Sequence, residues 1–176
     1  MKTLDAAYIA IGAALITIGS WISIPTTVPF TMQTFAVFLV LMLLGGLRGT
    51  LSIVVYILLG MVGVPVFSGF NGGLGVILGK TGGYIVGFVL TGILYGLFVK
   101  LLGEKRAVQL TALVIGLAAC YAVGTVWFIY IYLRDIGAVA YMTVLSWCVF
   151  PFIVPDLLKL GLACVIAKRV KPVIKG

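Results

Sequence analysis

Long runs of apolar residues, separated by short segments rich in glycine, proline or charge, cover most of the chain. A helix needs about 20 mostly apolar residues to cross the hydrocarbon core of a bilayer. Runs at or near this length predict six transmembrane helices, at 4–24, 33–47, 49–64, 82–102, 107–133 and 146–167. Because the breaks between the runs are short, we expect residues 1–176 to form a single six-helix membrane domain with an all-α fold.

The composition favours a protein embedded in a lipid bilayer over a soluble domain. Hydrophobic residues make up 63% of the 176 residues and charged residues 9%, whereas soluble domains carry about 25% charged residues. The apolar run after Met1 and Lys2 has a signal peptide's beginning, but five further runs follow it. We therefore expect the first run to be retained as a helix.

The positions of the charges predict how the chain is oriented. In a six-span threading, three cations fall on one side, Lys80, Arg134 and Lys159, and nine fall on the other: Lys2, Arg48, Lys100, Lys105, Arg106, Lys168, Arg169, Lys171 and Lys175. Basic residues accumulate on the cytoplasmic side of membrane proteins. Both termini are then cytoplasmic, and the net charge of +8 does not indicate a nucleic-acid partner.

The residue types needed for an enzyme or a metal site are scarce. The chain has no histidine, four carboxylates and three cysteines without a paired spacing, Cys120, Cys148 and Cys164. Histidine is the commonest metal ligand and general base, and isolated cysteines in apolar segments usually pack as small apolar side chains. We expect neither catalysis nor a bound metal or other cofactor.

One stretch, residues 60–87, concentrates irregular backbone, with ten of the chain's 23 glycines. Such backbone survives at membrane depth only where protein buries it or where it lines a cavity, and glycine lets backbone approach a ligand closely. We interpret this outer loop 3 as the wall of a binding pocket. Its candidate contacts are Tyr84, Gly72, Gly73 and Asn71, although Asn71 could instead supply a left-handed turn.

A possible nucleotide-binding motif within this stretch fails on inspection. Gly79, Lys80 and Thr81 resemble the end of a P-loop, but that motif requires a glycine where the chain has Leu74, and no strand precedes it. We therefore do not expect this chain to bind ATP by itself.

Three polar residues near the predicted outer surface complete the candidate site. Gln33 begins the second span, where its amide either satisfies a helix end or contacts a ligand. Pro155 suits the first turn of a helix, so we expect Asp156 and Lys159, three residues apart, to share one face just inside that start. They form either a structural ion pair or part of a substrate site, and we favour the substrate site because ionisable pairs within membranes usually mark one. Among the aromatic residues of the fifth span, which include Tyr121, we expect one or two to face the pocket.

Small residues recur every four positions along the first span, at Ala6, Ala10 and Ala14. This spacing places them on one helical face that a second helix can approach closely. The second helix belongs either to the same bundle or to a separate membrane subunit, and the spacing alone does not decide between them.

Three segments together resemble the BioY family, the biotin-binding S components of energy-coupling factor (ECF) transporters. They read V-P-F-T-M-Q-T at 28–34, G-V-P-V-F-S-G-F-N-G-G-L-G-V-I-L-G-K-T-G-G-Y at 63–84 and P-D-L-L-K at 155–159. Lys80 stands where the family pattern leads us to expect proline. The resemblance extends over nearly the whole chain.

The resemblance implies a substrate-capturing subunit in the plasma membrane of a prokaryote. It implies biotin bound near the outer surface, with Asp156 accepting ureido N–H groups and Lys159 or Asn71 donating to a ligand oxygen. Transport would need a transmembrane coupling subunit and two cytoplasmic ATPases that use ATP, and the family's alanine-rich face matches Ala6, Ala10 and Ala14. The alternatives are an S component for another vitamin, such as thiamine, and a membrane scaffold subunit without transport function.

Overall fold

The structure, a computed structural model, describes residues 3–175. Outside these residues lie Met1, Lys2 and Gly176. The prediction that both termini are cytoplasmic rests in part on them. The elements in chain order are α1 (Thr3–Trp21), β1 (Ser23–Ile24), β2 (Phe30–Thr31), α2 (Gln33–Met61), η1 (Ser68–Phe70), α3 (Leu74–Ile77), α4 (Gly82–Leu102), α5 (Arg106–Asp135), α6 (Tyr141–Cys148) and α7 (Phe150–Lys175).

The described part of the chain is a helical bundle with five segments long and apolar enough to cross a membrane. Four of them are α1, α2, α4 and α5, and the fifth is Tyr141–Pro172, which includes α6 and most of α7. Many large apolar side chains point outward from these helices. The expectation of a helical, multi-pass membrane protein is confirmed.

Helix α2 consists of two segments that meet at Gly45. Gly45 has φ +80° and ψ 175°, a conformation that residues with a side chain rarely adopt. On either side of it, Gln33 Nε2 donates to Tyr56 Oη at 2.9 Å, whereas a straight helix would separate two residues 23 apart by about 34 Å. The chain therefore reverses at Gly45, three residues before the break predicted between the second and third apolar runs.

Several helix boundaries differ from those predicted, and two of the differences have a clear structural setting. The prediction that the first helix continues to residue 24 is wrong: α1 ends at Trp21 because Ser23–Ile24 pairs antiparallel with Phe30–Thr31. The prediction that Pro155 begins a helix is also wrong, since α7 begins at Phe150 and contains Pro155 in its interior. A proline there forgoes one helical hydrogen bond, which shows that packing of the surrounding chain outweighs that loss.

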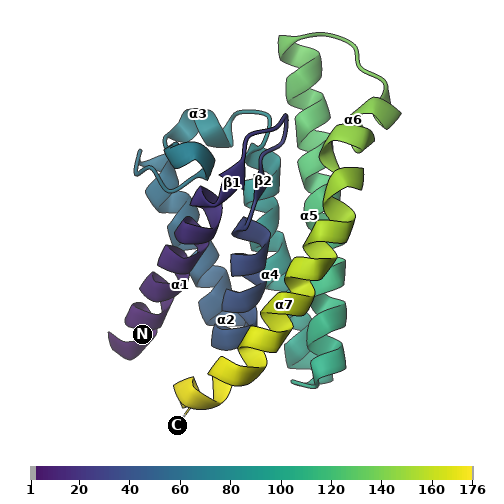
Figure 1. Ribbon diagram of the computed structural model, residues 1–176. Helices are drawn as coiled ribbons and strands as arrows, with labels where there is room; N and C mark the ends of the chain where they lie inside the picture. The colour runs from purple at the N-terminus through teal and green to yellow at the C-terminus, as the bar shows by residue number, and fades with distance from the viewer. Residues whose placement is uncertain (1–2, 176) are drawn as a thin grey trace.

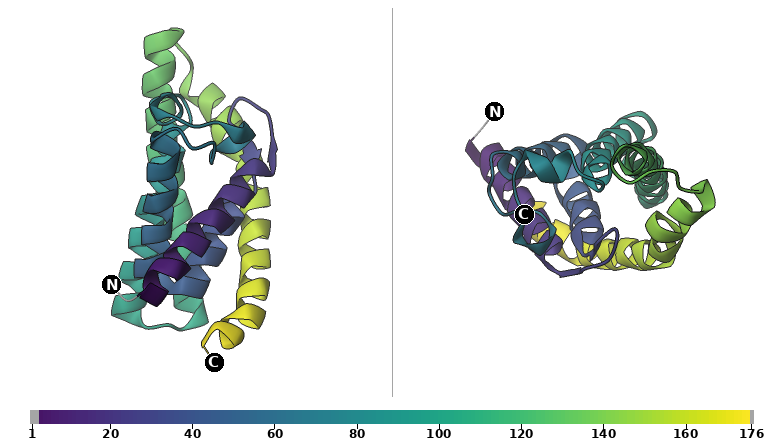
Figure 2. Two further views of the ribbon diagram at one scale, coloured as in Figure 1. Left: turned by 90° about the vertical axis from the view of Figure 1, so that its left-hand side faces the viewer. Right: turned by 90° about the horizontal axis from the view of Figure 1, so that it is seen from above.

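The loops and the helix ends are divided between opposite ends of the bundle (Figure 1). The β1–β2 hairpin, η1, α3 and α6 lie at one end, and the start of α1, the α4–α5 turn and the end of α7 lie at the other. Helix α1 packs on α2, α4 packs on α5, and α2 also contacts α4 and α7. Figure 2 shows α1 and α7 inclined to the other helices, with the loops gathered above them.

Candidate functional site

A cavity of about 180 Å³ lies at the loop-bearing end of the bundle. The loops and α3 contribute Val28, Pro29, Thr31, Phe67, Ser68, Asn71, Val76 and Thr81, and the longer helices and α6 contribute Gln33, Thr34, Tyr84, Ile85, Phe88, Leu117, Cys120, Tyr121, Cys148, Phe152 and Asp156. Segments from residue 28 to residue 156 thus converge on one mostly apolar space with a few polar groups, an arrangement typical of small-molecule sites.

The glycine-rich segment forms one wall of this cavity through a compact turn. Gly69 and Gly73 both have positive φ angles, +70° and +96°, so the backbone reverses around them. The N–H of Phe67 donates to the carbonyl of Asn71 at 2.9 Å, and the Asn71 side-chain amide donates to the carbonyl of Ser68 at 2.8 Å. The turn therefore holds Phe67, Ser68 and Asn71 together at the cavity.

Phe67 also anchors this turn to the bundle. Its ring lies directly over Gly60 of α2, where any side chain would collide with it. The same ring meets Tyr56 edge to face, with the centroids 5.4 Å apart. Phe67 is only 1% exposed, so one side of it fixes the loop while another lines the cavity.

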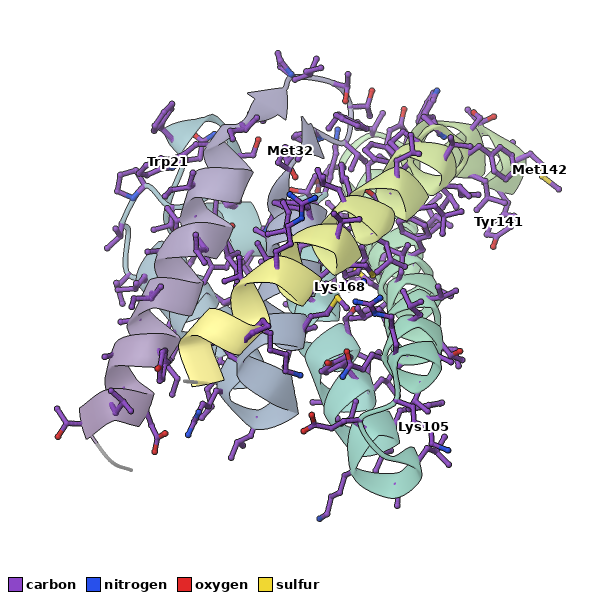
Figure 3. All side chains as sticks on the ribbon, turned by 60° about the horizontal axis from the view of Figure 1, so that its bottom comes forward. Trp21, Met32, Lys105, Tyr141, Met142 and Lys168 are labelled. Atoms are coloured by element: carbon purple, nitrogen blue, oxygen red, sulfur yellow. The ribbon has the colours of Figure 1, made fainter. Side chains whose placement is uncertain are left out.

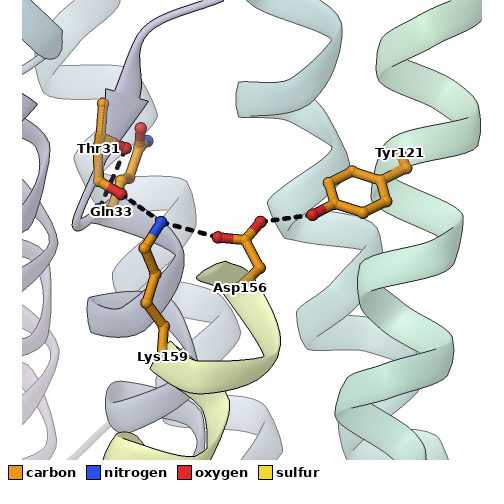
Figure 4. Close-up of polar contacts among 5 residues, drawn as sticks. All are labelled: Thr31, Gln33, Tyr121, Asp156 and Lys159. Carbon is orange, nitrogen blue, oxygen red and sulfur yellow. Dashed lines mark hydrogen bonds and ion pairs between the residues drawn. The ribbon is translucent and has the colours of Figure 1, made fainter. Parts of the chain in front are cut away.

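The ion pair of Asp156 and Lys159 lies on α7, where Asp156 lines the cavity. Lys159 Nζ is 2.8 Å from Asp156 Oδ1, and both side chains are almost completely buried. Figure 4 shows that the pair has a partner on each side. Lys159 Nζ donates to the backbone carbonyl of Thr31 at 2.7 Å, and Tyr121 Oη donates to Asp156 Oδ2 at 2.6 Å.

Lys159 connects α7 to the β1–β2 hairpin. Besides its bond to the Thr31 carbonyl, its ammonium lies 4.1 Å from the centroid of the Phe30 ring, a distance at which a cation and an aromatic ring attract each other. Phe30 in turn stacks on Phe152 of α7, with the centroids 5.8 Å apart. These contacts hold the hairpin against the start of α7 and close that side of the cavity.

Gln33 lies in a second buried polar chain. Its backbone N–H donates to Thr31 Oγ1 at 3.2 Å, and its side-chain amide donates to Tyr56 Oη, which donates to Ser20 Oγ at 3.2 Å. One of the two amide hydrogens is therefore used within the protein. Because Gln33 lines the cavity, its side-chain oxygen and its second amide hydrogen can face a ligand.

Tyr84 is placed by a close approach of α4 and α5. Its ring packs against Gly124, where a side chain would overlap it, and its hydroxyl shares a hydrogen bond of 3.1 Å with Thr125 Oγ1. Tyr84 is 9% exposed. Glycine at position 124 thus makes room for a large aromatic residue in the cavity wall.

The residues predicted for the site divide into two groups in space. Four of them line the cavity: Gln33, Asn71, Tyr84 and Asp156. Lys159 is bonded to Asp156 but is not part of the lining. Gly72 and Gly73 are not part of it either; a side chain on Gly72 would collide with the carbonyls of Gly63 and Val64, so this glycine serves the folding of the loop.

Several lining residues were not identified from the sequence. Tyr121 was one of five aromatic residues of its helix, and nothing in its spacing marked it as the partner of Asp156. Cys120 and Cys148 were interpreted as packing residues; both are buried as expected, and both also line the cavity. Phe67 lies within the glycine-rich motif, which is the one signal that could have identified it.

The alanine face of α1 points away from the bundle. Ala6, Ala10 and Ala14 are all exposed, whereas Ala13 and Ile16 of the same helix pack in the core. Between the two alternatives for this face, packing inside the bundle is therefore excluded for the described chain.

The comparisons with known proteins agree with one another. The family model described as "BioY family" matches residues 1–176. The chain is 44% identical over 162 residues to the biotin transporter BioY of Thermotoga maritima, covering 90% of each protein. It is 38% identical over 172 residues to the probable biotin transporter BioY of Pyrococcus horikoshii, covering 97% of this chain and 98% of that one.

A solved structure also matches the fold. It is a crystal structure of the S-component for biotin from an ECF-type ABC transporter, with a TM-score of 0.84 and 28% sequence identity. The match covers 98% of this chain and 95% of the other.

Proposed function

The chain belongs to the BioY family, and from this premise we propose that it is a biotin-binding S component of an ECF-type transporter. The relatives' names and the matched crystal structure support this reading. It is a transport role, and we propose no enzymatic activity.

The proposal rests chiefly on the position of Asp156 in the cavity lining. Asp156 is the one charged residue in the cavity lining among residues 3–175, and Lys159 and Tyr121 each occupy one of its oxygens. Because an ionised carboxylate offers about four acceptor positions, positions remain for the N–H groups of a ureido ring. The apolar body of biotin suits walls that include Phe67, Phe88 and Leu117.

The remaining predicted contacts take different roles in this proposal. Asn71, at the rim, has a side-chain carbonyl and a second amide hydrogen for a ligand. Lys159 lies behind Asp156 and holds Thr31, so we propose that it positions the carboxylate and the hairpin instead of donating to the ligand. Gly72 and Gly73 shape the turn that carries Asn71.

The same geometry weighs against thiamine, a cationic vitamin. Since Lys159 lies 2.8 Å from Asp156, the pair presents no net negative charge to a cation. A scaffold role without any ligand would not explain the cavity or the buried polar groups that line it.

Calorimetric titration of the purified protein in detergent tests the function. Biotin should bind at one site per chain, and thiamine added at the same concentration should not compete. Tight thiamine binding would replace biotin as the substrate, and absence of affinity for either vitamin would favour the scaffold alternative.

We further propose six membrane crossings, with the cavity at the outer face and both termini in the cytoplasm. The reversal at Gly45 turns α2 into two antiparallel segments, which supports six crossings. The start of α1 and the end of α7 lie at the same end as the α4–α5 turn (Figure 1), where most of the basic residues are found. The membrane would be the plasma membrane of a prokaryote.

Cysteine labelling of intact cells with an impermeant reagent tests this orientation. Thr26→Cys, in the exposed hairpin loop, should be labelled, and Lys105→Cys, in the α4–α5 turn, should not. The parent protein, with its three native cysteines, gives the background. The reverse pattern would invert the proposed topology.

For the partners, we propose a transmembrane coupling subunit and two cytoplasmic ATPases. The failed P-loop motif at Leu74 leaves this chain without a nucleotide site of that kind, so energy from ATP would come from other subunits. The outward-facing Ala6, Ala10 and Ala14 offer a flat helical face for the coupling subunit, because small residues allow close helix approach.

A further inference from the structure

A second hollow lies at the other end of the bundle, between the start of α5 and the last turns of α7. Two cavities of about 360 and 440 Å³ share Arg106, Cys164 and Lys168 in their walls and therefore adjoin. We name this hollow the basic groove and define it by Met42, Arg106, Cys164, Lys168, Arg169 and Lys171. The proposed function makes no use of it.

The charges of the basic groove favour an anion. Arg106 from α5 and Lys168, Arg169 and Lys171 from α7 supply four cations. Among the described residues of its lining, Glu104 is the one carboxylate, 3.6 Å from Lys171 Nζ. Four cations against one carboxylate leave the groove with a net charge of +3.

The deeper part of the groove is apolar. Met42 of α2 and Ala167 of α7 are 3% and 4% exposed, and the sulfurs of Cys164 and Met42 lie 3.8 Å apart. Val165, in the wall of the second cavity, is 54% exposed. The apolar wall therefore extends from the interior of the groove to the outer surface of the bundle.

The groove exists because α5 and α7 pack on different neighbours. Helix α5 packs chiefly on α4, and α7 packs chiefly on α2. In Figure 3, Lys168 extends from α7 into the space beside α5, whereas Lys105 lies at the tip of the α4–α5 turn and points away from it. Cations at this end of the molecule thus differ in whether they face the groove.

We propose that the basic groove binds an anionic phospholipid, with its phosphate among Arg106, Lys168 and Lys171 and an acyl chain along Val165. Basic pockets between helices at the cytoplasmic membrane surface suit anionic head groups, and the groove lies at that surface in the topology proposed above, on which this inference rests. A free phosphate would use the cations but not the apolar wall. A phospholipid uses both, and Val165 lies within the candidate membrane span Tyr141–Pro172, so an acyl chain beside it would lie among the chains of the bilayer.

Lipid titration of the delipidated protein in neutral detergent, read by native mass spectrometry and thermal stability, tests this site. Dioleoyl phosphatidylglycerol should bind more tightly than dioleoyl phosphatidylcholine. The double variant Arg106→Gln with Lys168→Gln should weaken phosphatidylglycerol binding on the order of tenfold and leave phosphatidylcholine binding nearly unchanged.

The matched control is Lys100→Gln with Lys105→Gln, which removes two cations from the same end but outside the groove lining. It should retain the preference for phosphatidylglycerol. If both double variants lose it equally, the charge acts diffusely and the site is refuted. If inorganic phosphate at the same concentration stabilises the protein as much as the lipid does, the ligand is a free anion and the lipid proposal fails. Lys168→Gln alone, at an exposed position, gives the same test with a smaller loss should the double variant not fold.

Discussion

The two ends of the molecule each contain a carboxylate–cation pair, and the pairs differ in burial far more than in distance. At the loop-bearing end, Asp156 and Lys159 lie 2.8 Å apart, with side chains 3% and 6% exposed. At the other end, Asp5 and Arg48 lie 2.6 Å apart, with side chains 22% and 46% exposed. Two ion pairs of nearly equal length therefore lie in very different surroundings, and burial sets what each is expected to contribute.

The difference in burial follows from what surrounds each pair. Asp156 and Lys159 have lost water and replaced it with Tyr121 and the Thr31 carbonyl, so removing either charge leaves the other buried and unpaired. Arg48 has the ring of Tyr8 beside it and remains accessible to water. We therefore expect large effects at the first pair and small effects at the second.

The largest effect is expected for Asp156→Asn. The substitution keeps an acceptor but leaves Lys159 without its counter-charge, and biotin affinity should fall by about 2–5 kcal/mol, as when a buried hydrogen-bonded charge pair is broken. Calorimetry on folded, monodisperse protein gives the value. The control is Asp135→Asn, an exposed carboxylate at the end of α5, which should bind as the parent does.

The double variant Asp156→Asn with Lys159→Met shows whether the pair serves binding or structure. If it only supports the fold, the double variant should recover affinity, because no charge is left unpaired. If Asp156 holds the ligand, the double variant should bind no better than the weaker single variant. Binding equal to the parent's would remove both residues from the site.

Tyr121→Phe should have the next largest effect. It removes the hydroxyl that orients Asp156 Oδ2, and hydrogen bonds to charged groups are worth about 1.5–3 kcal/mol. Biotin affinity should fall by that amount while the stability of the fold changes less. Tyr130→Phe, on the same helix but 61% exposed, is the matched control; an equal loss in both would contradict the role of Tyr121.

Ala10→Trp separates the binding end from the face proposed for the coupling subunit. The added bulk should cost about 1–3 kcal/mol of association, comparable to overpacking in a core, and biotin affinity should not change. Copurification with a tagged coupling subunit, beside a binding assay, measures both. Unchanged assembly would remove the alanine face from the interface.

Arg48→Gln should have the smallest effect. Exposed ion pairs contribute about 0–1 kcal/mol, so thermal unfolding should shift little and biotin binding should be unaffected. Raising the salt concentration should reduce even that difference. A loss of more than about 2 kcal/mol in the free energy of unfolding would contradict this expectation, because an exposed pair would then contribute as much as a buried one.

Local patterns in the sequence were sufficient to predict the helices and one part of the candidate site. Apolar runs located the helices, and the prediction that Asp156 and Lys159 share one helical face is confirmed by their contact at 2.8 Å. Both inferences depend only on neighbours along the chain. The break between the second and third apolar runs, predicted at residue 48, also depends on neighbours along the chain and lies three residues from the turn at Gly45.

Contacts between distant segments could not be predicted in this way. Strands of two residues, such as Ser23–Ile24, leave no alternating pattern, and the contacts of their hairpin with α7, through Phe30 and Thr31, are equally invisible in the sequence. The bond from Lys159 to Thr31 and that from Tyr121 to Asp156 join segments whose separation has no periodic signature. The prediction that Pro155 begins a helix was wrong for a related reason, since packing of distant segments outweighed the local preference of proline for a helix start.

The hydrogen bond between Lys159 and the Thr31 carbonyl can form only late in the synthesis of the chain. The two residues are 128 positions apart, and the chain is made from its N-terminus. The hairpin and Gln33 emerge from the ribosome long before the lysine that closes them against α7. Asp156 and Lys159 emerge within one helical turn, so each charge enters the membrane with its partner. The proposed binding site is therefore completed only when the last helix joins the bundle, and a nascent chain that stops after α5 lacks the α6 and α7 walls of the cavity.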